Sequence, residues 1–273
     1  MRVLCSVHTH SCLCDGRDTL AEMAQAAYEA GAVSFGASGH SHTPIPYDRG
    51  NVLPADPVAY RAEVLGLREA YRGQMDVLLG IEQDACADGP VPDWVDYWIG
   101  SVHNLRGPDG AYYPVDWDAE RFRETIRALS PGDPVGLAER YYGAVAEMAR
   151  RRPTILGHVD LVTKFNEGGA FFREGDPRYR AAAQAALRAA DVAVTLLEIN
   201  TGAVARGYRT VPYPAPFLLK AWREMGGRII LTADAHAAAG IVYGYAQAAE
   251  VARAAGYDRS VVLTATGPRE VSL

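Results

Sequence analysis

Imidazole and carboxylate side chains stand at the ends of short apolar runs along this chain, in positions suited to metal-assisted chemistry. All seven histidines lie at or just beyond such runs, Glu82 ends a further run, and Asp234 ends the run that precedes His236. Mixed imidazole and carboxylate ligands favour zinc, manganese, iron or cobalt. Because one ion takes three or four protein ligands, nine candidates predict three divalent ions, with Glu82 bridging two of them. The candidates are His8, His10, Asp15, His40, Glu82, His103, His158, Asp234 and His236.

Spacing groups some of these candidates before any fold is assumed. One residue separates His8 from His10, and one separates Asp234 from His236. Alternate residues of a strand face the same side, so each pair shares one face. Each pair can therefore chelate one ion. His42 follows His40 at the same spacing, and we expect it either to donate a proton beside the metals or to support a ligand.

The candidate ligands require strands that end at one place, and the apolar runs supply them. Seven runs read as strands, each followed by a helical pattern: 2–7, 33–38, 76–81, 97–102, 154–157, 192–199 and 228–233. Thr19 with Glu22, and Asp-Pro pairs at 56–57, 133–134 and 176–177, mark helix starts. We predict an α/β fold, a distorted (βα)7 TIM-like barrel, as a single domain over residues 1–273. An eighth apolar run, at 260–264, ends in no candidate ligand. We expect this run to form an edge strand or a terminal hairpin. The alternative to the seven-stranded fold is an ordinary eight-stranded barrel.

Composition restricts the classes of protein to which the chain can belong. Its 273 residues carry a formal charge of -6, and the dispersed arginines do not form the concentrated basic patch that nucleic acids require. The opening MRVLCSVHTH lacks the apolar core of a signal peptide, and no run reaches the roughly 20 apolar residues of a membrane span. Cys5, Cys12, Cys14 and Cys86 lack zinc-finger spacing. They are expected to be unpaired, buried residues in a reduced cytoplasm, although the first three flank histidine motifs and could be ligands.

The ordered series of motifs resembles the PHP (polymerase and histidinol phosphatase) superfamily, and within it the PHP-type histidinol-phosphatases. The motifs are HTHSCLCDG at 8–16, SGHSH at 38–42, GIEQD at 80–84, IGSVHNL at 99–105, GHVDLVTKFNE at 157–167, EINTGAVARGYRTVPYP at 198–214 and TADAH at 232–236. They cover nearly the whole chain, and the series is far more specific than HxH alone. One position departs from the pattern, because Gly39 stands where the superfamily often has an acid.

The resemblance implies a distorted (βα)7 barrel, a ligand set for each ion and a reaction. His8, His10, Glu82 and Asp234 would hold the first ion, Glu82, His103 and His158 the second, and Asp15, His40 and His236 the third. The implied reaction is hydrolysis of L-histidinol phosphate to L-histidinol and phosphate, in histidine biosynthesis. A hydroxide that bridges two ions would attack phosphorus in line with the leaving group.

Basic side chains near the motifs are candidates for binding phosphate. Lysine is rare, and of Lys164 and Lys220 only Lys164 lies in a loop close behind a strand-end histidine. Arg206, in a glycine-flanked loop, can offer two parallel donors to phosphate; Arg209 competes, and the resemblance favours Arg206. Glu198 is expected to bind the substrate's ammonium, to brace a ligand histidine or to make a buried structural hydrogen bond. The predicted catalytic residues are His42, Glu82 and Arg206, and the predicted substrate-binding residues are Lys164, Arg206, His42, Arg209 and Glu198.

Two other functions compete with this prediction. A PHP-type phosphoesterase acting on nucleotides or oligonucleotide ends should place basic and aromatic residues beside the site, whereas the one basic run, at 150–152, ends a predicted helix. A non-catalytic metal-binding domain should have lost ligands, yet every superfamily ligand position is filled. The sequence predicts a small phosphomonoester as the partner, with no nucleic acid and no membrane, and leaves the oligomeric state open.

Overall fold

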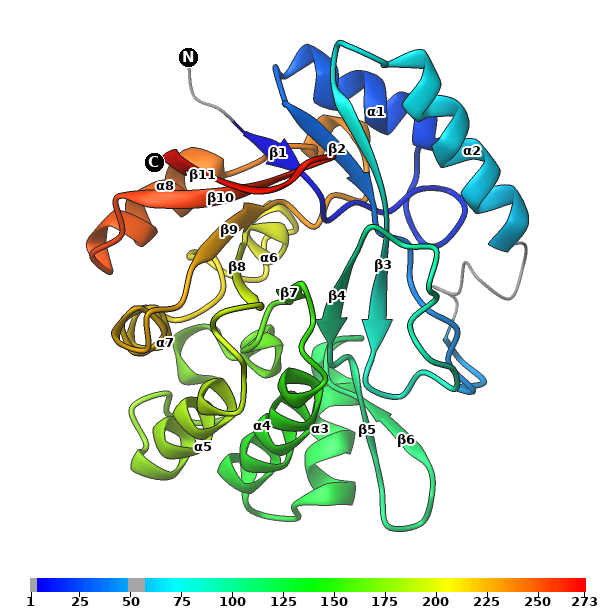
Figure 1. Ribbon diagram of the computed structural model, residues 1–273. Helices are drawn as coiled ribbons and strands as arrows, with labels where there is room; N and C mark the ends of the chain where they lie inside the picture. The colour runs from blue at the N-terminus through cyan, green and yellow to red at the C-terminus, as the bar shows by residue number, and fades with distance from the viewer. Residues whose placement is uncertain (1–3, 49–56) are drawn as a thin grey trace.

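A parallel sheet that curls into a distorted barrel forms the centre of the molecule (Figure 1). The computed structural model describes residues 4–48 and 57–273. Within these ranges eight parallel strands pair in chain order: β1 Cys5–Ser6, β2 Ser34–Ala37, β3 Asp76–Asp84, β4 Tyr97–Ser101, β7 Ile155–Leu156, β8 Leu196–Asn200, β9 Ile229–Thr232 and β10 Arg259–Thr264. The first seven correspond to the seven runs, so the predicted α/β barrel architecture is confirmed.

Backbone hydrogen bonds close the seven-stranded barrel just beyond the ends of its first and last strands. Thr9 and Ala235 form an isolated parallel bridge. The His10 amide donates to the Ala235 carbonyl at 2.8 Å, and the Ala235 amide donates to the His8 carbonyl at 3.0 Å. The bridge lies between residues that carry candidate ligands. Closure of the barrel therefore brings the ligands of the first strand next to those of the last.

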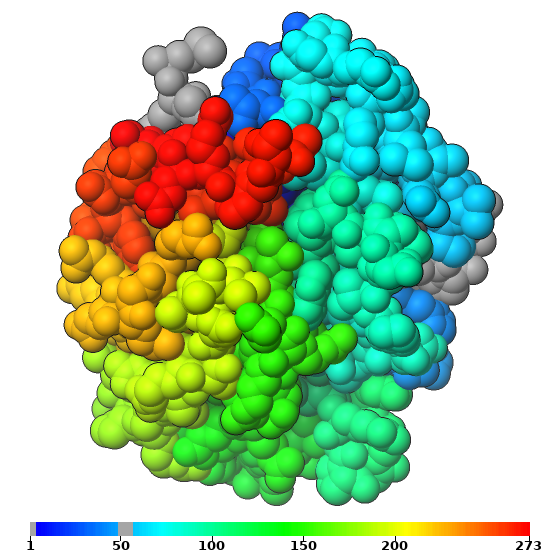
Figure 2. Space-filling view, viewed as in Figure 1, coloured from blue at the N-terminus to red at the C-terminus, as the bar shows by residue number. Residues whose placement is uncertain are grey.

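The eighth apolar run belongs to a terminal hairpin and is not an eighth barrel strand. β10 pairs with β11 (Gly267–Ser272) along its whole length but meets β9 at a single residue pair. The Ser34 hydroxyl donates to the Leu263 carbonyl, and the Ala265 amide donates to Asp76 Oδ2 at 2.9 Å. These bonds hold the hairpin across the N-terminal ends of β2 and β3, at the surface shown in red in Figure 2. The predicted hairpin is confirmed, and the alternative of an ordinary eight-stranded barrel is wrong.

The bounds of some strands differ from the prediction. β8 begins at Leu196, because residues 192–195 form a turn in which the Asp191 carboxylate and carbonyl accept backbone amides. β3 continues beyond residue 81 to Asp84, so it carries two acids on its last three residues. Residues 2 and 3 of the first predicted strand lie outside the described residues. A second sheet, the hairpin of β5 Asn104–Arg106 and β6 Tyr112–Pro114, was not predicted.

Helices cover the outside of the sheet and connect successive strands (Figure 1). They are α1 Leu20–Glu29, α2 Pro57–Ala70, α3 Ala119–Leu129, α4 Pro134–Arg150, α5 Pro177–Arg188, α6 Gly202–Ala205, α7 Pro216–Glu224 and α8 Tyr245–Ala254, with 3-10 turns at Leu161–Thr163, Glu167–Gly169 and Ala238–Gly240. Thr19 and Glu22 form the predicted capping box, and Asp133 and Asp176 cap α4 and α5. The predicted cap at Asp56 lies outside the described residues. None of the helices in the described part of the chain is long and apolar enough to span a bilayer.

Apolar side chains from the strands and from the terminal hairpin fill the interior of the barrel on the N-terminal side of the candidate ligands. Tyr97, at the start of β4, belongs to this core, and its hydroxyl donates to the Val7 carbonyl at 2.6 Å. Its ring lies against the backbone of Gly36 on β2 and Gly80 on β3, where an added Cβ would come within 2.3 Å of it. Both positions therefore require glycine, and the packed ring supports the site from below.

Gly80→Ala is expected to destabilise the protein by about 1–3 kcal/mol, because the methyl group would collide with the buried ring of Tyr97. Gly66 is exposed in α2 with open space around it, and Gly66→Ala should stabilise the protein by about 0.5–1 kcal/mol through helix propensity. Urea unfolding followed by circular dichroism measures both free energies. A stabilising effect of Gly80→Ala would contradict the packing described.

Candidate metal centre

A cavity of about 400 Å³ opens at the C-terminal edge of the barrel, where the nine candidate ligands meet. Seven of the nine line it, and His8 and His10 lie beneath them, fully buried. We call these nine residues the histidine–acid cluster. The structure thus brings together every residue that was selected as a ligand from its position at a strand end. That they bind metal stays a prediction.

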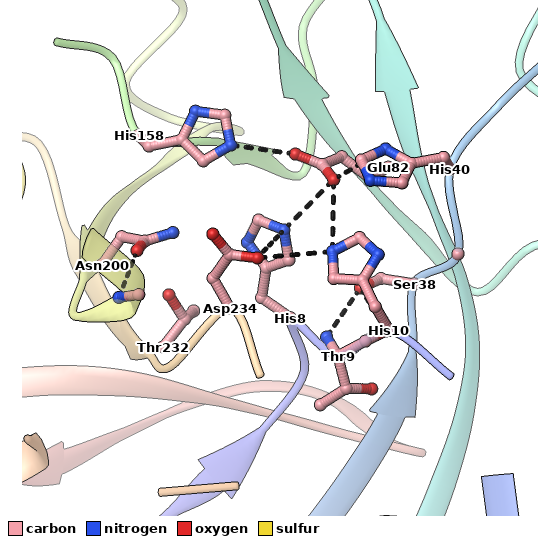
Figure 3. A network of polar contacts seen from close by, with 12 residues as sticks. His8, Thr9, His10, Ser38, His40, Glu82, His158, Asn200, Thr232 and Asp234 are labelled. Carbon is pink, nitrogen blue, oxygen red and sulfur yellow. Dashed lines mark hydrogen bonds and ion pairs between the residues drawn. The ribbon is translucent and has the colours of Figure 1, made fainter. Parts of the chain in front are cut away.

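Four ligand atoms form the first group of the cluster (Figure 3). Glu82 Oε2 lies 3.4 Å from His8 Nε2 and 3.3 Å from His10 Nε2. Asp234 Oδ1 lies 3.6 Å and 3.4 Å from the same two nitrogens. Tetrahedral ligands at the usual zinc distances of about 2.0–2.1 Å would lie about 3.3–3.4 Å from one another. These four nitrogen–oxygen distances therefore suit ligands that share one ion.

Two buried imidazole nitrogens of this group lack a hydrogen-bond partner, which tests whether the residues fit a metal. His8 Nε2 and His10 Nε2 are both buried and unpartnered, while His8 Nδ1 lies 2.5 Å from a carboxylate oxygen of Glu198. Buried polar atoms in native proteins nearly always have a partner. A divalent ion would supply that partner to both nitrogens at once. The residues of the first group fit a metal ion.

The second group faces the other carboxylate oxygen of Glu82. Glu82 Oε1 lies 3.4 Å from His103 Nε2 and 3.0 Å from His158 Nε2. The two oxygens of one carboxylate thus face two separate sets of imidazoles. Glu82 lies where a ligand that bridges two ions would have to lie.

The third group surrounds Asp15, in the loop after β1. Its carboxylate oxygens lie 3.5 Å from His40 Nε2 and 3.2 Å from His236 Nε2. His10 Nδ1 also lies 3.5 Å from Asp15 Oδ1, so His10 stands between the first and third groups. The rings of His10 and His236 are stacked with their centres 4.3 Å apart. The three groups form one continuous cluster.

Opposite charges in the cluster stabilise one another against burial. Burial by itself would lower the pKa of His8, but Glu198, Glu82 and Asp234 surround the ring and raise its pKa to about 10. Burial opposes ionisation of Glu82, yet His8 and His103 help to hold its pKa well below the usual value. Buried carboxylates require compensating positive charge. Divalent cations would supply that charge to the same oxygens.

Two carboxylates behind the cluster fix the orientation of its histidines. Glu198, on β8, contacts His8 Nδ1 and accepts the His158 amide at 2.6 Å. Asp84, at the end of β3, lies 2.9 Å from His103 Nδ1. Glu198 is completely buried and does not line the cavity. Its predicted role in substrate binding stays a prediction that this placement does not support, and the expectation that it braces a ligand histidine fits its contacts.

The backbone of Asp234 is strained into the conformation that aims its carboxylate at the cluster. Its φ of +49° lies in the left-handed region, which costs a non-glycine residue about 1–2 kcal/mol. Arg206 Nη2 donates to Asp234 Oδ2 at 3.0 Å. A Cβ on Gly202 would come within 2.8 Å of both atoms, so this close approach requires glycine. The helix start at Gly202 thus helps to place both side chains.

Two of the predicted phosphate-binding cations line the cavity. Lys164 is nearly buried, and its Nζ lies 2.6 Å from the Asp116 carbonyl oxygen and 5.0 Å from the centre of the Tyr208 ring. Arg206 has a third of its side chain exposed at the cavity edge. Both are placed where they could meet a phosphate group next to the cluster.

Two other predicted site residues point elsewhere. Arg209 Nη1 donates to the Thr163 carbonyl at 2.9 Å and to Glu174 at 3.0 Å, which ties two loops together. His42 Nδ1 lies 2.6 Å from Asp88 Oδ2, at the surface. Neither side chain lines the cavity. The structure therefore does not bring Arg209 or His42 into the cavity, because each is held by an acid outside it. The substrate-binding role of Arg209 and the catalytic and substrate-binding roles of His42 stay predictions.

The cysteines match the expectation only in part. All four are free, and Cys5 is buried in the barrel core as expected. Cys12 is exposed, which corrects the expectation for that residue. Cys14 Sγ lies 3.5 Å from His10 Nδ1, close to the cluster.

Sequence reasoning missed several residues that shape the cavity. Asp84 follows Glu82 by two residues on the same strand, so the spacing argument used for the histidines could have found it. Asp116 and Trp117 lie between β6 and α3, and Tyr47 lies in the segment after β2. None of these three ends an apolar run, and nothing in the sequence shows that their loops fold over the barrel mouth.

Comparisons with known proteins agree with this geometry. The family model described as PHP domain matches residues 5–202. A histidinol-phosphatase of Bacillus subtilis is 28% identical over 88% of this chain and 95% of its own length. A Deinococcus radiodurans protein described as a probable histidinol-phosphatase is 32% identical over 94% and 95%. The crystal structure of histidinol phosphate phosphatase from Lactococcus lactis, complexed with zinc, L-histidinol and phosphate, superposes with a TM-score of 0.68 and 18% identity over 97% of this chain and 98% of its own.

Glu198→Gln is expected to lower the affinity for zinc about 10–100-fold, because a neutral amide orients the His8 ring less firmly than a carboxylate. Titration of metal-free protein with zinc against a chromophoric chelator measures the change. Glu167→Gln, which alters a half-exposed carboxylate paired with Arg209, is the control and should leave the affinity unchanged. An unaltered zinc affinity in folded Glu198→Gln protein would show that Glu198 does not support the metal site.

Proposed function

This chain belongs to the PHP domain family, and we propose that it is a histidinol-phosphatase, which hydrolyses L-histidinol phosphate to L-histidinol and phosphate in histidine biosynthesis. The position of Glu82 carries the proposal, because its two oxygens face separate sets of histidines beside Lys164 and Arg206. Such a site combines ligands for more than one ion with side chains that suit phosphate. The relatives that share the name are similar over almost their whole length.

The proposal includes three divalent ions held by the histidine–acid cluster. His8, His10, Glu82 and Asp234 would hold the first, Glu82, His103 and His158 the second, and Asp15, His40 and His236 the third. Zinc is favoured because the Lactococcus lactis enzyme is complexed with it, and manganese, iron and cobalt suit the same ligands. When bound, such ions supply Lewis acidity and make water a nucleophile near neutral pH.

The chain's own residues would bind and orient the phosphate group. Arg206 can direct two donors at phosphoryl oxygens, and Lys164, which lines the same cavity, can add a point charge. Glu198 and Asp84 hold His8 and His103 in place, so the cluster does not need to rearrange when the substrate enters. The catalytic contribution of these side chains is positioning and charge stabilisation.

A small substrate fits the cavity better than a nucleic acid end. The volume of the cavity, about 400 Å³, lies in the range of small-molecule sites. Beyond the cluster its wall carries the acids Asp48, Asp84 and Asp116, which would repel a second phosphate along a strand. These features favour a monoester with a single phosphate over the nucleotide or oligonucleotide alternative.

The proposal also places the whole chain in one domain in the cytoplasm. Apolar side chains from β1, near the start of the chain, and from β10 and β11, at its end, share one core. Four free cysteines suit a reducing compartment. The proposed partner is the small phosphomonoester itself.

Phosphate release from L-histidinol phosphate, AMP and glucose 6-phosphate tests the proposed function, with zinc or manganese supplied. We expect kcat/KM for L-histidinol phosphate to exceed that for the other esters at least about tenfold. Removing metal with a chelator should abolish release, and restoring it should recover activity. A faster reaction with AMP or the sugar phosphate would contradict the proposed substrate, and no activity after metal is restored would contradict the enzyme.

Arg206→Ala should raise KM for L-histidinol phosphate at least about tenfold, because a charge-assisted pair of hydrogen bonds to phosphate is lost. Steady-state kinetics and metal analysis of the same preparation measure both consequences. Lys220→Ala, an exposed residue on α7, is the control and should change neither. Loss of metal from Arg206→Ala would instead show that Arg206 acts by holding Asp234.

A further inference from the structure

One part of the cavity wall combines aromatic rings with an acid. Tyr47 and Trp117 meet edge to face, with ring centres 5.7 Å apart and planes at 89°. The Tyr47 hydroxyl donates to Asn104 Oδ1 at 3.0 Å, and about half of Trp117 is exposed. Asp116 directly precedes Trp117 and lines the same wall. Aromatic faces beside a carboxylate favour a flat, cationic ligand.

Asp116 differs from the other two non-cluster acids that line this cavity. Asp84 is buried, with its oxygens engaged by His103 and by the Cys86 amide. Asp48 accepts a hydrogen bond from the Thr43 hydroxyl. The carboxylate of Asp116 is a quarter exposed, and its Oδ2 lies 3.5 Å from Lys164 Nζ.

The charge state of Asp116 suits a cationic ligand. Burial opposes its ionisation, but Lys164 together with His103 and His158 lowers its pKa below the usual value. Asp116 lines the same cavity as His103 and His158 of the second group. A ligand group bound by Asp116 would therefore lie near the reacting phosphate.

The covalent structure of L-histidinol phosphate matches this arrangement. Two carbon atoms separate its ammonium nitrogen from the ester oxygen, which places these atoms about 3–4 Å apart. If Lys164 binds a phosphoryl oxygen, its neighbour Asp116 lies within reach of that ammonium. The imidazole, one further carbon away, would extend toward Trp117 and Tyr47.

We infer that Asp116 is a specificity-determining residue that binds the substrate's ammonium group, while Trp117 and Tyr47 cover its imidazole ring. This inference rests on the proposed function and deepens it. In this arrangement the cavity binds the phosphate group on the side of the cluster and the cationic amino alcohol on the side of Asp116. It also distinguishes L-histidinol phosphate from esters that carry no positive charge.

Kinetic measurements on two proteins, the wild type and Asp116→Asn, each with two substrates, test the inference. The substrates are L-histidinol phosphate and 3-(imidazol-4-yl)propyl phosphate, which differs only by replacement of the amino group with hydrogen. Wild-type protein should prefer the natural ester about 10–100-fold in kcat/KM, because the charge-assisted hydrogen bond is made only with the ammonium. Asp116→Asn should reduce this preference to about one by losing activity on the natural ester alone, with unchanged metal content.

Asp109→Asn provides a matched control, because Asp109 lies in the exposed turn of the β5–β6 hairpin that precedes Asp116 and contacts Tyr113 outside the cavity. It should leave both reactions unchanged. Equal losses on both esters in Asp116→Asn would overturn the inference, since Asp116 would then act through Lys164 or the metals. A preference that survives in Asp116→Asn, or that is missing from the wild type, would overturn it as well.

Failure of the proposed function would be seen in a different measurement. A wild-type enzyme that hydrolyses AMP or glucose 6-phosphate faster than L-histidinol phosphate would overturn both the function and the inference. A wild-type enzyme that prefers L-histidinol phosphate, with an Asp116→Asn variant that keeps the amino-group preference, would overturn the inference alone.

Discussion

The buried carboxylate of Glu82 sets the conditions under which this site can exist. It is about 1% exposed and lies within 3.4 Å of nitrogens from five histidines, which reach it from four other segments of the chain. An unpaired carboxylate in such surroundings would cost many kcal/mol or become protonated. Positive charge around both of its oxygens is therefore a requirement of the fold as well as of the chemistry. Ions that satisfy this requirement stabilise the same arrangement that would carry out the reaction.

The barrel meets this requirement through the way its strands end. β3 is the longest of the barrel strands and carries Glu82 near its C-terminal end, with a further bridge between His40 and Glu82 beyond the end of β2. The bridge between Thr9 and Ala235 likewise joins the chain beyond the ends of the first and last strands. Each bridge extends pairing past a regular strand, so the backbone that carries the ligands is held as firmly as the sheet itself. The ligand side chains are held in position because backbone hydrogen bonding continues from the strands into the loops.

The sequence could predict those parts of the site that follow from strand periodicity. His8, His10 and Glu82 were placed correctly because a strand end fixes both the position of a side chain and the face on which it lies. His42 and Arg209 were expected in the site but lie outside the cavity, because their directions depend on acids in distant loops, Asp88 and Glu174, which no local pattern reveals. Glu198 was selected from the sequence, but only the tertiary structure shows that its oxygens are used by His8, His158, Asn200 and Thr232. Asp116 follows a hairpin that was not predicted, and it does not end an apolar run.

The balance of charge around the cavity ties substrate binding to metal binding. In residues 4–48 and 57–273, Lys164 and Arg206 are the lysine and arginine side chains that line the cavity, and Arg206 is already paired with Asp234 at 3.0 Å. A phosphate dianion that approached the cluster without cations would meet the carboxylates of Asp15, Glu82 and Asp234, whose negative charge the surrounding imidazoles offset only in part. Divalent ions bound by the same carboxylates reverse the sign of the local charge. The acids that bind the ions therefore determine, through them, whether a phosphate ester binds at all.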